Sequence, residues 1–187
     1  MSEADRLPPL APEALSAAQR RAAEELAAGR RGALFGPFIP LLRSPELLSR
    51  AQRLGEYLRY ESALPARLRE LAILVTAQHY RQAYEWHVHA PLAAAAGISA
   101  PLIAAIGRGE RPERLDAVEA EIHDFCRELH RAHRVSDARY AAVQARHGEM
   151  GLIDLVGICG YYGLLALVLN VARTPLPEGA SPPPWLG

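Results

Sequence analysis

The hydrophobic positions along the chain recur at helical spacing, and no stretch alternates apolar and polar residues over the length of a strand. Ala, Leu, Arg and Glu, which favour helices or are compatible with them, dominate the composition. We therefore predict an all-α fold that forms a compact helical domain. Glycines, prolines and capping residues delimit the expected helices, which cover residues 13–28, 45–62, 66–80, 84–96, a short segment from 101, 115–134, 138–147 and 151–172.

One apolar segment interrupts this helical pattern. Residues 32–40, GALFGPFIP, are rich in Gly and Pro, and we expect a loop there rather than a helix. Because its remaining side chains are apolar, we also expect this loop to line a cavity. Further along, Asp137 is the expected cap of the helix that follows it.

The last expected helix, residues 151–172, has no polar face and carries one charge, Asp154. Its length and hydropathy would suffice to cross a membrane. However, Asp154 lies inside the stretch, no basic residue flanks its N-terminal end, and the other helices are amphipathic. These features favour a buried central helix, and we expect no contact with a membrane.

Charge and cysteine content narrow the class of function. The 21 basic and 21 acidic side chains balance, so there is no electrostatic basis for binding nucleic acid. Lysine is absent, which excludes Schiff-base chemistry through a lysine. The two cysteines, Cys126 and Cys159, form neither a CxxC pair nor a disulfide framework, and we expect inert core thiols. The N-terminus lacks the pattern of a secretory signal, so we expect a cytoplasmic protein.

The densest group of functional side chains lies between His79 and His89. Glu85 and His89 are one helical turn apart and can face one pocket, with Gln82 one turn earlier and Trp86 beside them. A carboxylate beside an imidazole is an acid/base pair in which each group adjusts the pKa of the other. The alternative is a solvated surface pair, which this spacing also produces.

We predict no metal and no cofactor. The Glu-x-x-His motif of carboxylate-bridged di-iron bundles does not occur in the sequence. Three histidines, His123, His130 and His133, lie near Cys126, but their neighbours are charged, which favours a structural or solvated role over a zinc site. No phosphate loop, dinucleotide fingerprint or nucleophile elbow is present.

Residues 69–99, RELAILVTAQHYRQAYEWHVHAPLAAAAGIS, resemble the core of the carboxymuconolactone decarboxylase family, whose other branch is alkylhydroperoxidase D. The peroxidase branch has a Glu, then a CxxC pair and a His. The matching positions here are Glu70, Gln82, Glu85 and His89, so both redox cysteines are replaced. The chain therefore resembles a subgroup without the CxxC pair, and is more similar to the decarboxylase branch.

The resemblance extends over about residues 30–178. It includes GPF at 36–38, the Ser-Pro-Glu start at 44–46, Tyr84-Glu85-Trp86, the YY pair at 161–162, Asn170 and PLPEG at 175–179. It implies an alkylhydroperoxidase D-like helical domain over 31–178, preceded by an arm and first helix over 1–30 and followed by a proline-rich tail over 179–187. It also implies a homo-oligomer, a trimer or hexamer, that acts on a small-molecule substrate.

The activity that the resemblance implies is cofactor-free decarboxylation of a small cyclic carboxylic acid or lactone. His89 would be the proton donor or would stabilise the dienolate, Glu85 would tune and orient it, and Glu70 would be a second acid/base group. The substrate-binding residues would be Tyr84, Trp86, Gln82 and Phe38, with Arg81 or Arg67 on a substrate carboxylate. Two alternatives are a thiol-dependent hydroperoxide reductase and a non-catalytic oligomeric protein that binds a small molecule.

Overall fold

A computed structural model describes residues 4–186, which contain α-helices and two short 3₁₀ helices but no strand. This confirms the all-α fold. In chain order the elements are η1 (Pro12–Ala14), α1 (Ala17–Ala28), α2 (Phe38–Leu41), α3 (Pro45–Tyr60), α4 (Ala66–His79), α5 (Ala83–Ala95), α6 (Ala100–Gly107), α7 (Ala117–Ala132), α8 (Asp137–Ala172) and η2 (Pro184–Leu186).

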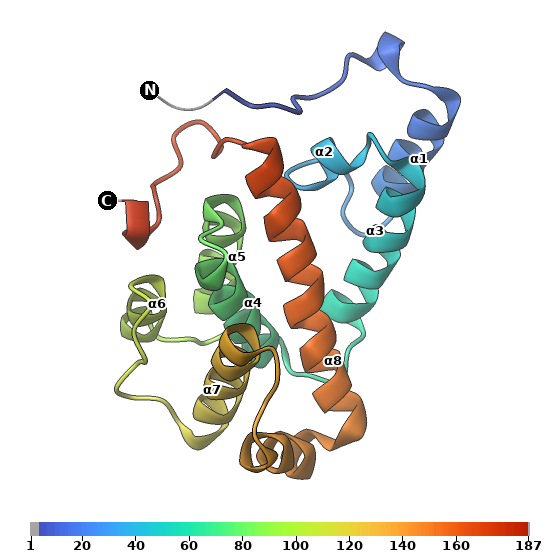
Figure 1. Cartoon of the computed structure of the whole chain (residues 1–187). Helices are drawn as coiled ribbons and strands as arrows, with labels where there is room; N and C mark the ends of the chain where they lie inside the picture. Colours follow the sequence, from blue (N-terminus) through green and yellow to red (C-terminus); the bar gives the residue numbers. More distant parts are fainter. Residues whose placement is uncertain (1–3, 187) are drawn as a thin grey trace.

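Helix α4 lies at the centre of the molecule and packs against α5, α7 and α8. Helix α8 runs along the length of the fold, with α1, α2 and α3 on one side of it and α4, α5 and α7 on the other (Figure 1). Nine of the fourteen residues of α4 are buried. A helix that is buried on most of its sides has little need of a polar face.

Local capping decides where several helices begin, and it corrects some of the expected bounds. Ser16 and Gln19 form a capping box, so the first long helix begins at Ala17 rather than directly after Pro12. Ser136, not Asp137, occupies the N-cap position of α8. Asp116 and Glu119 form a second capping box at the start of α7.

The expectation of a loop throughout residues 32–40 was wrong at its end, where α2 is a short helix over Phe38–Leu41. Its Pro40 lies in the first turn, where the backbone N–H groups have no partner within the helix in any case, so a proline is tolerated. Residues 32–37 are a loop, with positive φ at Gly32 and Gly36.

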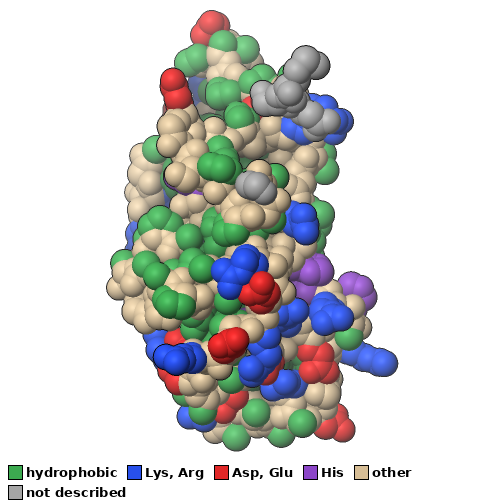
Figure 2. Space-filling model, turned by 90° about the vertical axis from the view of Figure 1, so that its left-hand side faces the viewer, with side chains coloured by type: hydrophobic (Ala, Val, Ile, Leu, Met, Phe, Trp, Pro, Cys, Tyr) green, Lys and Arg blue, Asp and Glu red, His purple; other side chains and the backbone are tan. Residues whose placement is uncertain are grey.

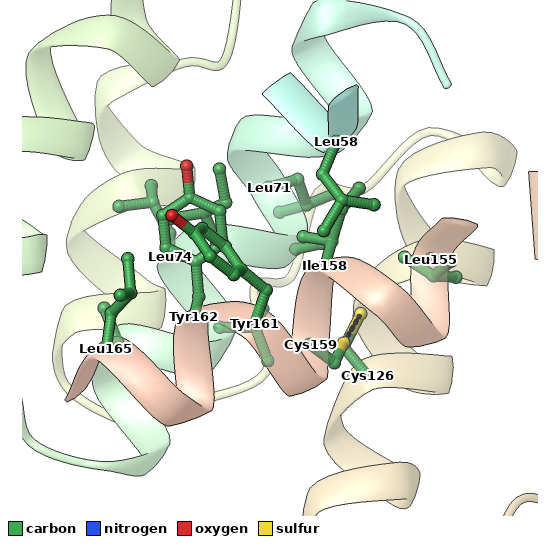
Figure 3. Packing of buried hydrophobic residues seen from close by; sticks show 14 of the residues in the cluster. Leu58, Leu71, Leu74, Cys126, Leu155, Ile158, Cys159, Tyr161, Tyr162 and Leu165 are labelled. Carbon is green, nitrogen blue, oxygen red and sulfur yellow. Dashed lines mark hydrogen bonds between the residues drawn. The ribbon is translucent and has the colours of Figure 1, made fainter. Parts of the chain in front are cut away.

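Helix α8 combines the two expected C-terminal helices across a kink at Gly148, whose φ of 69° and ψ of 179° are not helical. By length and composition the helix could cross a membrane, but 61% of its most apolar window is buried inside this fold. Leu155, Ile158 and Leu165 of this helix belong to the core (Figure 3), whereas Ile153, Leu167 and Val171 are exposed. Asp154 is buried there as well, and accepts hydrogen bonds from Tyr57 Oη at 2.9 Å and from the Ala63 amide at 2.8 Å.

The two cysteines meet where α7 packs against α8. Both thiols are free and buried, and their sulfur atoms lie 3.5 Å apart (Figure 3). The expectation of core thiols is confirmed by their burial. Helix packing brings together two residues that their spacing in the sequence does not pair.

Both ends of the described chain are attached to the domain. Arg6 N donates to Ala172 O at 2.8 Å, which places the N-terminal arm on the end of α8. In the C-terminal tail, the Trp185 ring packs edge-on against Trp86 of α5, with ring centroids 5.0 Å apart. The side of the molecule that carries α6 and this tail has acidic and basic side chains intermixed over its lower part (Figure 2).

Candidate active site

Helices α4 and α5 bring two carboxylates to opposite nitrogens of one imidazole. Nδ1 of His89 lies 2.7 Å from Oε2 of Glu70 on α4, and Nε2 of His89 lies 3.6 Å from Oε2 of Glu85 on α5. All three residues are buried. The alternative of a solvated Glu85–His89 pair is therefore wrong.

The turn between α4 and α5 sets this geometry. It consists of residues 80–82, and Arg81 has a left-handed φ of 49°. Gln82 caps α5 and donates through Nε2 to Oδ1 of Asn170 at 2.8 Å, while Nδ2 of Asn170 donates to the Tyr80 carbonyl at 2.9 Å. The turn is thereby attached to α8, which fixes where His89 lies relative to the rest of the core.

The two carboxylates differ in their surroundings. Burial raises the pKa of Glu85, although the neighbouring His89, Arg31 and Arg59 oppose this shift. Glu85 therefore holds its proton to a higher pH than an ordinary glutamate. Glu70 instead forms the short contact to the imidazole, so it is the group that fixes the orientation of the His89 ring.

A tyrosine from α8 completes the immediate surroundings of the imidazole. The Tyr162 ring lies edge-on to His89, with ring centroids 5.0 Å apart and an interplanar angle of 86°. Burial raises the pKa of Tyr162 well above its usual range, so its hydroxyl stays neutral. The neutral ring shields the imidazole from water on that side.

A small cavity lies beside Glu85 and His89, with a volume of about 20 Å³. This is room for about one water molecule. The loop after α1, helix α3, helix α5 and helix α8 all contribute to its wall. The lining residues are Arg31, Phe35, Pro37, Phe38, Arg59, Tyr84, Glu85, Val88, His89, Tyr162 and Leu165.

Two arginines of this lining have no carboxylate partner within residues 4–186. Arg31 lies over the Phe38 ring at 4.6 Å, and its Nη2 donates to Tyr161 Oη at 3.4 Å. Its Nε is buried without any hydrogen-bond partner in the described chain. Arg59 lines the same cavity from α3. Positive charge is thus available to an anion at this point.

The structure does not bring every predicted site residue to the cavity. The cavity is lined by Tyr84, Phe38, Glu85 and His89. Glu70 lies behind this lining and contacts the His89 imidazole. The arginines suggested for a substrate carboxylate lie elsewhere: Arg67 forms ion pairs at the start of α7, and Arg81 is exposed in the turn. The remaining two have structural contacts, Gln82 with Asn170 and Trp86 with Trp185.

Sequence reasoning missed Arg31, Arg59 and Tyr162 because they come from three elements outside the His79–His89 segment. The one available signal was the position of Arg31 directly before the apolar 32–40 segment, which was itself expected to line a cavity. Within the described residues, no group of three or more His, Cys, Asp or Glu side chains has an arrangement that could hold a metal ion.

Comparison with known proteins agrees with the fold. The family model "Carboxymuconolactone decarboxylase family" matches residues 45–137, from the start of α3 to the start of α8. The match includes Glu70, Glu85 and His89. No curated protein matches the chain significantly. The fold and the buried imidazole between two carboxylates define an all-α protein of the alkylhydroperoxidase D-like type. The chain belongs to the carboxymuconolactone decarboxylase family.

Proposed function

We propose that this protein is a cofactor-free acid/base enzyme that decarboxylates a small cyclic carboxylic acid or lactone. The observation that carries the proposal is the buried His89 imidazole held between Glu70 and Glu85, beside a cavity with two arginines that have no carboxylate partner among residues 4–186. The family supports the same chemistry. The cavity lining contains no cysteine, which disfavours thiol chemistry at this site.

In an unsaturated γ-carboxylactone, the bond between the ring carbon and the leaving carboxylate breaks, and its electron pair moves through the ring alkene to the lactone carbonyl. Carbon dioxide leaves, and a dienolate remains. One proton must then be delivered to carbon. The protein has to position the leaving carboxylate, stabilise the dienolate oxygen and supply that proton.

The geometry supports a separate role for each group. Arg31 and Arg59 bind a substrate carboxylate that is not lost. Glu85 lines the cavity and its raised pKa favours the protonated form, which makes it the proton donor or a hydrogen-bond donor to the dienolate oxygen. His89 relays the proton, and Glu70 orients the imidazole through Nδ1. In this assignment Glu70, not Glu85, has the orienting role.

A substrate of this size cannot enter a cavity of about 20 Å³ without movement of its wall. The loop over residues 32–37 is the part that can move, because it is irregular and has positive φ at two glycines. It also carries Phe35 and Pro37 of the lining. We propose that its displacement admits the substrate and that its return excludes water during decarboxylation.

The test is turnover of γ-carboxymuconolactone, followed by loss of substrate absorbance and release of carbon dioxide. His89→Gln should lower kcat/KM by at least about a hundredfold. The matched control is His87→Gln, on the same helix and outside the cavity lining, which should leave the rate unchanged. Equal rates for the two variants would exclude the site. Ligand-induced thermal stabilisation without product would instead indicate a binding protein, and thiol-dependent loss of a hydroperoxide that disappears in His89→Gln would indicate a reductase at this site.

We also propose that the chain forms a homo-oligomer, a trimer or hexamer, through one face of α8. Exposed apolar side chains recur at helical spacing along it, and the most exposed are Met150, Ile153, Leu167 and Val171, at 67%, 64%, 50% and 64%. A stripe of this kind is typical of a protein–protein interface. Leu167→Glu should reduce the mass measured by light scattering. Leu186→Glu, a change of a more exposed leucine in the tail (61%), should not.

A further inference from the structure

A second cluster of reactive groups lies between α4, α7 and α8, and the proposed decarboxylation does not use it. Its centre is the pair of free thiols of Cys126 and Cys159, whose sulfur atoms are 3.5 Å apart (Figure 3). The sulfurs of a disulfide are about 2.05 Å apart, so an approach of about 1.5 Å would join them.

A histidine and a threonine complete the cluster. Nε2 of His130, one turn after Cys126 on α7, lies 2.9 Å from Oγ1 of Thr76 on α4. The Thr76 hydroxyl donates its own proton to the Ala72 carbonyl at 2.8 Å, so Oγ1 accepts from the His130 ring. The ring is therefore held in one orientation within the core.

The surroundings make the two thiols unequal. The contact with the Cys126 thiol lowers the pKa of Cys159, and the nearby His130 lowers it further, although burial opposes the shift. The same contact and burial raise the pKa of Cys126. This difference favours Cys159 over Cys126 as the attacking sulfur.

A small cavity lies between α4 and α7 and reaches His130, although neither cysteine lines it. Its volume is about 70 Å³, which is enough for a molecule of the size of hydrogen peroxide. His130 forms part of its wall, so the same ring faces the cavity and the thiol pair. The other lining residues are Val75, Gln78, His79, Arg127 and Arg131.

We propose that Cys126 and Cys159 are a redox-active dithiol that forms a reversible disulfide between α7 and α8 when hydrogen peroxide enters this cavity and passes His130 to reach the sulfurs. The Cys159 sulfur attacks one peroxide oxygen, the O–O bond breaks, and Cys159 becomes a sulfenic acid as one water molecule leaves. The Cys126 sulfur then attacks the sulfenic sulfur, the S–S bond forms, and a second water molecule leaves. Two electrons pass from the two sulfurs to the two peroxide oxygens. A dithiol reverses the change and is itself oxidised to a disulfide.

This site is separate from the one beside His89. Neither cysteine lines the His89 cavity, and the positions of a CxxC pair in the peroxidase branch correspond to Gln82 and Glu85. The proposal therefore stands or falls independently of the decarboxylation, and its test needs no substrate.

The test treats the full chain with hydrogen peroxide, quenches it with acid, unfolds it and alkylates it with iodoacetamide before mass measurement. The chain has two cysteines, so the count of alkylated sites is unambiguous. We expect no alkylation and a mass lower by two hydrogen atoms. Dithiothreitol should restore both sites, and peptide mapping should join the Cys126 peptide to the Cys159 peptide within one chain. Two alkylatable cysteines after treatment, or disulfides only between chains, would overturn the proposal.

Serine variants test the order of the steps. Cys126→Ser should stop at the sulfenic acid of Cys159, with a mass raised by one oxygen atom and trapping by dimedone. In Cys159→Ser, the remaining thiol should oxidise at least about tenfold more slowly than Cys159 does in Cys126→Ser. Equal rates in the two variants would contradict the assignment of Cys159 as the nucleophile. Circular dichroism checks that both variants are folded, and the wild-type result decides the disulfide in either case.

Discussion

The contact between the 32–37 loop and Tyr84 provides a quantitative test of how the His89 cavity is covered. Gly36 has a φ of +51°, and a Cβ atom there would lie 2.6 Å from Cε1 of Tyr84. Gly32 is the matched control in the same loop, because its φ is +73° but a Cβ atom would meet nothing within 4 Å. Both glycines have a left-handed backbone, but only at Gly36 would a Cβ atom meet the Tyr84 ring.

The expected cost of each alanine follows from these two terms. A left-handed backbone costs an alanine about 1 kcal/mol, and this is the whole effect expected for Gly32→Ala. Gly36→Ala adds the overlap with the Tyr84 ring, which costs about 1–3 kcal/mol more. Its total loss in the free energy of unfolding is therefore about 2–4 kcal/mol.

The assay is urea unfolding followed by circular dichroism at a helical wavelength. Measured in a Tyr84→Ala background, the cost of Gly36→Ala should fall to that of Gly32→Ala, because the ring that causes the overlap is gone. Equal costs for the two glycines in the wild-type background would refute the contact, and with it the view that this loop closes the cavity over Tyr84.

Three further predictions concern the core and the tail. The folded state holds the Glu85 proton more tightly than the unfolded chain does, so ionised Glu85 destabilises the fold above the usual carboxyl pKa of about 4.3. Glu85→Gln should therefore raise the Tm at about pH 7.5 but not at about pH 4. An equal gain at both pH values would contradict the raised pKa of Glu85. Asp154→Ala should lower the free energy of unfolding by about 2–4 kcal/mol in urea, since it removes the buried carboxylate that accepts hydrogen bonds from both the Ala63 amide and Tyr57 Oη, whereas Tyr57→Phe, which removes one of the two bonds, should cost about 1 kcal/mol; similar costs would argue against this role. Trp185→Ala should speed hydrogen exchange over residues 180–186 through loss of the Trp86 contact, and unchanged exchange would show that the tail is held by other contacts.

The sequence was most informative where a function depends on local spacing. Glu85 and His89 lie on one helix, four residues apart, so their proximity follows from helix geometry alone. Glu70 came from the family resemblance, because its short contact to the imidazole depends on how α4 packs against α5. Periodicity also indicated that α8 is a core helix, and Asp154 is buried in it with two hydrogen-bond donors.

What the sequence could not provide depends on packing between elements that are distant in the chain. Arg31, Arg59 and Tyr162 reach the cavity from three separate elements. The arginines suggested instead are close to the site in the sequence but not in the fold. Arg67 forms ion pairs at the start of α7, and Arg81 is exposed in the turn before α5. The two cysteines lie 33 positions apart, and no local pattern indicates that α7 and α8 place their sulfurs side by side.

The measurement that tests the proposed chemistry most directly is decarboxylation of γ-carboxymuconolactone in heavy water during the first turnovers. An acid/base centre at Glu85 and His89 predicts that each carbon dioxide released is matched by one deuteron bound to carbon in the product, at a rate lost in His89→Gln. Carbon dioxide release without deuterium on carbon, or the same rate in His89→Gln, would contradict proton delivery by this site.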